Sequence, residues 1–138
     1  MTDSTTDRGA QSTPKRRALI TCADRYMGRA IAEKFRKIGI EVVESVSPLT
    51  SAADVERVIA EAGRIDILVA NLAEPPMTAP VDAIDDSDWQ RLFARLVDPL
   101  MHLVRAVTPQ MLERKSGKII AVTSAAPLKG IANNAAYC

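Results

Sequence analysis

The sequence is poor in the residues that build metal centres, disulfide frameworks and base-stacking surfaces. Its 138 residues include two cysteines, one histidine, one tryptophan, two tyrosines and two phenylalanines. Cys22 and Cys138 lie far apart and form no metal or redox spacing, so we expect both to be structural. No His, Cys, Asp or Glu cluster has the spacing of metal ligands. The lack of a disulfide framework fits a reducing compartment, and we expect a cytoplasmic protein without a metal.

Charge of one sign and long apolar runs are also missing. The chain carries 18 basic and 17 acidic side chains, which gives no electrostatic reason to expect nucleic acid or an anionic membrane as a partner. No apolar run is long enough to span a bilayer, and the polar N-terminus does not resemble a signal peptide. Hydrophobic residues make up 47% of the chain, enough for a core. We expect a flexible tail at residues 1–16 and one folded domain at 17–138.

Apolar periodicity in this domain predicts strands that alternate with helices. The expected strands are residues 17–22, 40–43, 65–70 and 118–122. The expected helices are residues 27–38, 51–62 and 86–114, of which the second is capped by Ser51 and the third is kinked at Pro99. Residues 73–80 are proline-rich and predict a loop. We expect a second loop from Thr123 and a further helix that begins near Asn134.

The alternation favours right-handed crossovers between parallel strands. The expected fold is α/β, a Rossmann-like doubly wound parallel sheet. We expect it to be cut short after its fourth to fifth helix, because the sequence stops just inside a predicted helix. Ligands of such sheets bind outside the carboxyl ends of the strands. The candidate site therefore consists of the turn after Cys22, the loop after Ala70 and the segment after Val122.

Two hydroxyl groups follow the last predicted strand. Ser124 comes directly after its carboxyl end, and Tyr137 follows thirteen positions later. A hydroxyl and a phenol brought to one edge of the sheet can act as an acid–base pair. The unperturbed phenol has a pKa of about 10, so it needs a nearby cation or dipole to work near neutrality. The alternative is that Ser124 caps a turn and Tyr137 packs in the core.

These motifs resemble the short-chain dehydrogenases/reductases in three ways: the Ser-x12-Tyr spacing, the strand order and the DILVAN segment at 66–71. That family binds NAD(P) on a Thr-Gly-x3-Gly-x-Gly turn and uses Ser, Tyr and Lys. Here TCADRYMG keeps Thr21 and Gly28 but has Cys22 and Tyr26 at the other glycines. A tyrosine ring fills space that the pyrophosphate needs, unless Tyr26 merely packs under the sheet. The family's catalytic asparagine is expected near Leu96, and none is present.

A relative of that family fits both motifs. Residues 21–28 match Thr-x4-(Phe/Tyr)-x-Gly, and Ser124 with Tyr137 matches the start of Ser-x12-Tyr-x3-Arg. The arginine of this motif would lie three residues beyond Cys138. Over residues 17–138 the sequence is similar to the halohydrin dehalogenases, of which it would be the N-terminal portion.

This resemblance implies a reversible closure of vicinal halohydrins to epoxides with halide release, and opening of epoxides by azide, cyanide or nitrite. Tyr137 would move the proton, and Ser124 would bind the substrate oxygen. Tyr26, Thr21 and Gly28 would form the halide pocket. The resemblance implies no redox cofactor and a homotetramer. The broad apolar face of the long predicted helix also suggests subunit packing.

Two alternatives remain open on the sequence. The first is an NAD(P)-dependent short-chain dehydrogenase/reductase with a degenerate cofactor turn, which NADH or NADPH binding would reveal. The second is a non-catalytic oligomerising scaffold. The residue four positions after Tyr137 would separate them: arginine favours the dehalogenase, lysine favours the reductase, and neither favours the scaffold.

Overall fold

The computed structural model describes residues 15–138, so residues 1–14 of the expected tail lie outside the described part of the chain. The described residues form a parallel sheet of four strands in the order β2-β1-β3-β4. The strands are β1 (Arg17–Ile20), β2 (Glu41–Glu44), β3 (Ile67–Ala70) and β4 (Lys118–Ala121). The chain runs from β1 outward to β2 and then crosses to the other side of β1 for β3. The Rossmann-like α/β fold expected from the sequence is therefore confirmed.

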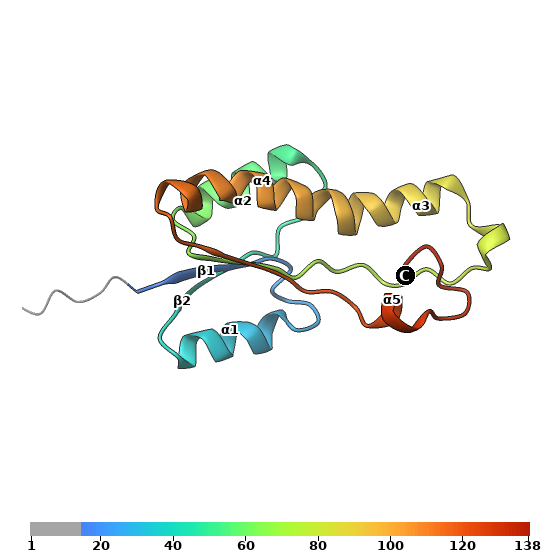
Figure 1. Cartoon of the computed structure of the whole chain (residues 1–138), viewed down its shortest axis with the longest axis horizontal. Coiled ribbons are helices and arrows are strands. Elements are labelled where there is room, and N and C mark those ends of the chain that lie inside the picture. Colours follow the sequence, from blue (N-terminus) through green and yellow to red (C-terminus); the bar gives the residue numbers. More distant parts are fainter. Residues whose placement is uncertain (1–14) are drawn as a thin grey trace, which may run out of the picture.

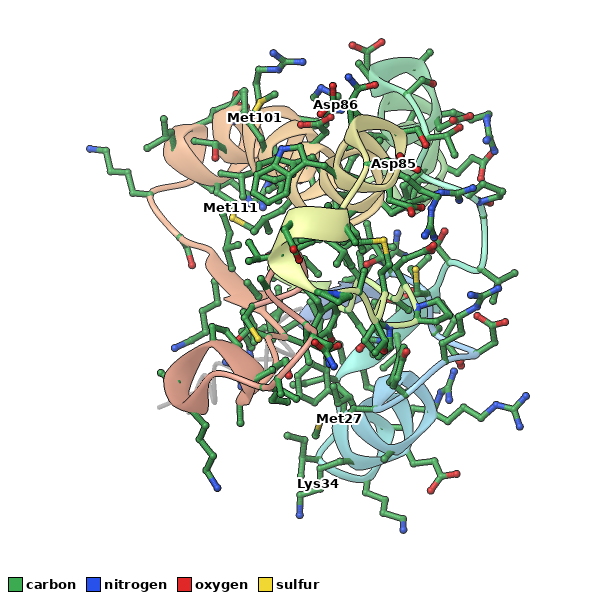
Figure 2. The ribbon with its side chains drawn as sticks, turned by 90° about the vertical axis from the view of Figure 1, so that its right-hand side faces the viewer. Met27, Lys34, Asp85, Asp86, Met101 and Met111 are labelled. Atoms are coloured by element: carbon green, nitrogen blue, oxygen red, sulfur yellow. The ribbon has the colours of Figure 1, made fainter. Side chains whose placement is uncertain are left out.

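Helices cover both faces of the sheet, as Figure 1 shows. α1 (Gly28–Lys37) lies on one face, and α2 (Ala52–Ala62) and α4 (Asp98–Glu113) lie on the other. Leu19 and Leu68 point toward α2 and α4, in a buried cluster with Val55 and Leu103. Alternate strand residues such as Ile20 pack on the α1 side. Figure 2 gives the same arrangement in an end view, with Met27 and Lys34 below the sheet and Met101 and Met111 above it.

The long helix expected at 86–114 is divided into three parts. α3 (Asp86–Leu92) passes into a π-helical turn, η2 (Phe93–Val97), and then into α4. Pro99 is the second residue of α4 and has no N–H for the carbonyl four residues earlier. The expected kink is thus a widened turn placed just before the proline. The predicted cap of α2 is confirmed, since the Ser51 side chain accepts a hydrogen bond from the Asp54 N–H.

The segment after β4 differs from expectation. The predicted loop contains a short helix, α5 (Ala126–Lys129), with Pro127 in its first turn. The helix predicted near Asn134 is wrong for the described structure, which has hydrogen-bonded turns there. Asn133 adopts a left-handed backbone, and its carbonyl accepts a hydrogen bond of 2.7 Å from the Ala79 N–H. This contact brings the last residues back against the loop that follows β3 (Figure 1).

Two short elements complete the description. The 3-10 turn η1 (Val81–Ala83) ends the loop after β3, and Asp85 then caps α3 by accepting a hydrogen bond from Asp88 N–H. Among residues 15–138, no helix is both long and apolar enough to cross a bilayer.

Candidate active site

The turn after β1 keeps the backbone shape of a glycine turn without its glycines. Cys22 and Tyr26 stand where the nucleotide-binding motif has glycine, and their φ angles are 45° and 46°. This left-handed region is rarely adopted by a side chain as large as tyrosine. The turn therefore keeps the glycine-like backbone conformation at a cost in conformational free energy. The side chains of Cys22 and Tyr26 occupy two positions that must lack a side chain where a pyrophosphate binds.

Asn71 ties this turn to the sheet. It follows β3, is 1% exposed, and its Nδ2 donates to the carbonyl oxygens of Cys22 and Arg25, both at 3.0 Å. Its backbone N–H donates to Thr21 Oγ1 at 3.1 Å. Sequence reasoning used Asn71 only as part of a family motif and missed this function. The available signal was an amide side chain directly after a fully apolar strand, where a buried polar group requires partners.

Thr21 and Gly28 have structural functions in this turn and do not line the pocket described next. Thr21 is fully buried, and its hydroxyl oxygen receives the Asn71 N–H. At Gly28, an added Cβ would lie 2.5 Å from the carbonyl oxygen of Ala23. Only a glycine lets α1 begin this close to the preceding strand end. The sequence-predicted placement of these two residues beside a bound halide stays a prediction.

Tyr26, Ser124 and Tyr137 line one pocket of about 390 Å³ at the carboxyl ends of β3 and β4. The other lining residues are mostly apolar: Met27, Ala70, Asn71, Leu72, Leu96, Leu100, Ala121, Val122, Thr123 and Pro127. The fold thus brings three of the five predicted site residues together, although Tyr26 precedes Tyr137 by 111 positions. A pocket with apolar walls and a few hydroxyl groups suits a small organic molecule.

Ser124 is fixed by a local contact that leaves its hydrogen available. Its Oγ accepts the backbone N–H of Ala126 at 3.0 Å, which also satisfies a donor at the start of α5. A hydroxyl has two acceptor sites and one donor, so the O–H of Ser124 remains free to donate to a molecule in the pocket.

Tyr26 forms a wall of the pocket. Its side chain is 67% exposed, and its hydroxyl lies 3.5 Å from the carbonyl oxygen of Glu74, in the loop after β3. The ring therefore reaches across the groove that a dinucleotide would follow. A separate small cleft of about 130 Å³ lies next to the pocket, and of the pocket residues only Leu72 lines both. The alternative that Tyr26 packs under the sheet is wrong, because its side chain is exposed at the pocket.

The pocket is electrically neutral in the described chain. None of its described lining residues has an ionisable acidic or basic side chain other than the two phenols. Leu96 lines it at the position where the sequence resemblance places a catalytic asparagine, and it belongs to the π-helical turn η2. The pocket thus presents the hydroxyl groups of Ser124 and Tyr137 among mostly apolar side chains, and no cationic side chain of the described residues lines it.

Comparisons with known proteins agree with this geometry at the level of family. The sequence profile described as short chain dehydrogenase matches residues 46–138. The chain is 29% identical to 2-keto-3-deoxy-L-fuconate dehydrogenase of Xanthomonas campestris pv. campestris, over 88% of this chain and 47% of that protein. It is 30% identical to a solved "Dehalogenation enzyme", with a TM-score of 0.77 over 89% of this chain and 59% of that one.

A solved short-chain dehydrogenase from Streptomyces avermitilis is similar too, with 26% identity and a TM-score of 0.78 over 89% of this chain and 54% of that one. The chain spans about half of the length of these three proteins.

Proposed function

The chain belongs to the short-chain dehydrogenase family, and we propose that within this family it works as a halohydrin dehalogenase. One observation carries the proposal. Tyr26 stands at a glycine position of the nucleotide turn and lines the same pocket as Ser124 and Tyr137. The substrate would be a vicinal halohydrin or an epoxide, and the second ligand a halide or another small anion. No nicotinamide is required for this chemistry.

Further observations support the proposal over a redox function. The family profile matches from residue 46 onward and so does not extend over the turn at residues 21–28. Leu96 offers no hydrogen bond at the position expected for the family's asparagine. A solved structure described as a dehalogenation enzyme shares 30% identity over most of this chain.

In the proposed reaction Tyr137 moves the proton and Ser124 orients the substrate. Tyr137, as phenolate, accepts the proton of the substrate hydroxyl. The oxygen then forms a bond to the neighbouring carbon while the carbon–halogen bond breaks, and the bonding electron pair leaves with the halide. Ser124 donates its hydrogen to the substrate oxygen and fixes its direction of attack. A cation near Tyr137 would lower the phenol pKa, and the motif assigns that function to an arginine four residues further on.

The halide would leave on the side of Tyr26. Tyr26 and Met27 line the pocket directly before the first residue of α1. The N-terminal end of a helix carries partial positive charge, and the first turn of α1 has no acidic side chain that would oppose an anion. The side chains of Leu72, Leu96 and Leu100 add apolar surface to the same pocket. In the reverse direction, azide, cyanide or nitrite would enter here and open an epoxide.

The proposal is tested by bromide release from a vicinal bromo-alcohol, with full-length protein and no nicotinamide. We expect one bromide and one proton per turnover. Ser124→Ala should lower kcat/KM by about 100-fold or more, since it removes the donor to the reacting oxygen. Thr123→Ala is the matched control, because Thr123 is a neighbouring exposed hydroxyl that lines the same pocket, and it should change kcat/KM little. Equal losses in both variants, or no release by the wild type, would contradict the proposal.

A second candidate is an NAD(P)-dependent dehydrogenase with an altered turn, which the dehydrogenase names of the relatives favour. Calorimetric titration with NADH and NADPH separates the two. The dehalogenase proposal predicts no binding by the wild type. The double variant Cys22→Gly/Tyr26→Gly reopens the glycine turn, whose backbone already has the required φ angles, and should gain measurable affinity. Tight binding by the wild type would instead support the dehydrogenase.

We also propose a homotetramer, assembled through the long helix. Leu92, Val107 and Met111 of the predicted apolar face belong to the chain's own core. A ridge at four-residue spacing stays exposed: Trp89, Phe93, Val97 and Met101. The rings of Trp89 and Phe93 pack at a tilt of 35°, with centroids 4.9 Å apart. Such a ridge suits helix packing between subunits. The cytoplasmic location stays a prediction from the sequence.

A further inference from the structure

The loop between β3 and η1 touches both sides of the pocket. Near its start, the carbonyl oxygen of Glu74 lies 3.5 Å from the hydroxyl of Tyr26. Near its end, the N–H of Ala79 donates at 2.7 Å to the carbonyl of Asn133, four residues before Tyr137. The loop thus connects the wall on the proposed halide side with the segment that carries the proposed base.

The contact between Tyr26 and Glu74 is weak by itself. An O–H···O distance of 3.5 Å is at the outer limit for a hydrogen bond. A small displacement of the Glu74 carbonyl away from the ring would therefore break this contact. Prolines at 75, 76 and 80 restrict the loop, and residues 71–78 have no regular secondary structure. A contact from outside the loop also holds its beginning.

Arg91 provides this anchor from α3. Its Nη1 lies 2.7 Å from Glu74 Oε1, and its Nη2 lies 3.1 Å from Asp88 Oδ1. The Glu74 side chain is 15% exposed, so the pair is partly shielded from water. Hydrogen bonds to Asp88 and Glu74 raise the pKa of Arg91 above its ordinary value, and the guanidinium stays charged. Asp88 in turn directs the guanidinium toward the loop.

We propose that Arg91 is a positioning residue, which holds Glu74 and through its backbone sets the orientation of the Tyr26 wall on the halide side of the pocket. The inference rests on the proposed function, because it assigns to this wall a specificity for the anion. Arg91 does not line the pocket and touches no reacting atom. Its loss should therefore change affinity for the halide and the substrate, and leave the proton transfer at Tyr137 nearly unchanged.

Three variants of the full-length protein test the inference by kinetics. Arg91→Met removes the donors and keeps much of the side-chain length. It should raise the KM for a bromo-alcohol and weaken inhibition by bromide about two- to fivefold, with kcat nearly constant, as expected for a partly exposed ion pair. Glu74→Gln should give the same change, and the double variant should be no worse than either. Arg91→Lys should restore most of the wild-type values.

Arg105→Met is the matched control. Arg105 is another exposed arginine on the same helical stretch, and its side chain has no hydrogen bond or ion pair within residues 15–138. It should leave KM, bromide inhibition and kcat unchanged. A fall of kcat at constant KM in Arg91→Met would overturn the inference, and so would equal effects of Arg91→Met and Arg105→Met.

A measurement of the Tyr26 ring that does not depend on catalysis separates this inference from the proposed function. Protein labelled with 3-fluorotyrosine gives a fluorine NMR signal for Tyr26, assigned by its loss in Tyr26→Phe. We expect this signal to shift or broaden in Arg91→Met and in Glu74→Gln, and to return in Arg91→Lys. An unchanged signal in folded Arg91→Met overturns the inference whatever the activity. A shifted signal in a protein that releases no bromide supports the positioning and contradicts only the dehalogenase.

Discussion

The turn after β1 and the segment after β4 both border the pocket, but they are held in different ways. The turn is fixed by buried contacts: Asn71 donates to two of its carbonyls, and Ala23 N–H donates to the Ser45 carbonyl at 3.1 Å. The segment after β4 follows an edge strand whose four residues are all exposed. It is held by short turns and by the single bridge between Ala79 and Asn134.

This difference suggests how the two proposed functions, anion binding and proton transfer, are divided between the two regions. The anion-side wall stands on a turn that hydrogen bonds tie to the sheet and to the end of β2, although the Tyr26 side chain itself is exposed. The proposed chemistry depends on the exposed Ser124 and the half-buried Tyr137, in a segment that is held mostly by local hydrogen bonds. Mutations in the turn should therefore act on stability as much as on binding, and mutations after β4 should act on activity with little effect on stability.

The largest effect is expected from Tyr137→Phe. Loss of the proton acceptor should lower kcat for bromide release by about 100- to 10,000-fold, while the melting temperature changes little because Tyr137 is only half-buried. Tyr26→Phe is the control on the other side of the pocket, and it should keep most of kcat. Steady-state kinetics of both variants measure these two values of kcat. A similar loss in both would mean that the two walls do not have separate functions.

Gly28→Ala should be the most destabilising change in the turn. An added Cβ would lie 2.5 Å from Ala23 O and 2.7 Å from Ala23 Cα, and backbone atoms cannot move aside without displacing α1. We expect a loss of about 3 kcal/mol in the free energy of unfolding, measured by urea titration. Gly39→Ala is the control. It has φ of 80° but no atom within 4 Å, so it should cost only about 1 kcal/mol.

Asn71→Ala tests the anchoring of the turn directly. It removes both side-chain hydrogen bonds to the carbonyls of Cys22 and Arg25. At about 1 kcal/mol for each bond, this should cost about 2 kcal/mol. Asn134→Ala removes a local hydrogen bond from the side-chain amide to the exposed Ala132 carbonyl, in the segment after β4. This should cost less than about 0.5 kcal/mol in the free energy of unfolding. Equal losses in the two variants would show that both regions are anchored alike.

The smallest effect concerns the two cysteines, one in each region. Burial is the main cause that raises the pKa of Cys22 above its ordinary value of 9.0. Its reactive thiolate is therefore scarce at pH 8 and increases only as the pH rises past 9. Cys138 is exposed. Alkylation with iodoacetamide, followed by mass spectrometry of peptides, should modify Cys22 several-fold more slowly than Cys138 at pH 8. Equal rates would contradict the partial burial of the Cys22 thiol in the turn.

Much of the fold could be predicted because its signals are local. The four apolar runs gave the strands, and Ser51 before an amphipathic segment gave the start of α2. The loss of glycine at Cys22 and Tyr26 was visible as well. That the backbone keeps the glycine conformation was not, because side chains of this kind normally avoid positive φ.

The parts that escaped prediction depend on non-local contacts. The amide of Asn71 meets carbonyls 49 and 46 positions earlier, and Arg91 meets Glu74 across 17 positions. Neither pairing leaves a periodic pattern in the sequence. The helix expected near Asn134 failed for a different reason. The Cys138 N–H does donate to the Asn134 carbonyl at 2.9 Å, but one helical hydrogen bond does not establish a helix.

The most direct test of the central claim is a crystal structure of the full-length protein with bromide and with excess NADPH, located by the anomalous scattering of bromine. The account predicts an anomalous peak between Tyr26 and the apolar wall of Leu96, near Tyr137, and no nicotinamide in the groove. Nicotinamide bound along the turn at residues 21–28, with no bromide beside Tyr26, would contradict it and would make the protein a dinucleotide-dependent member of its family.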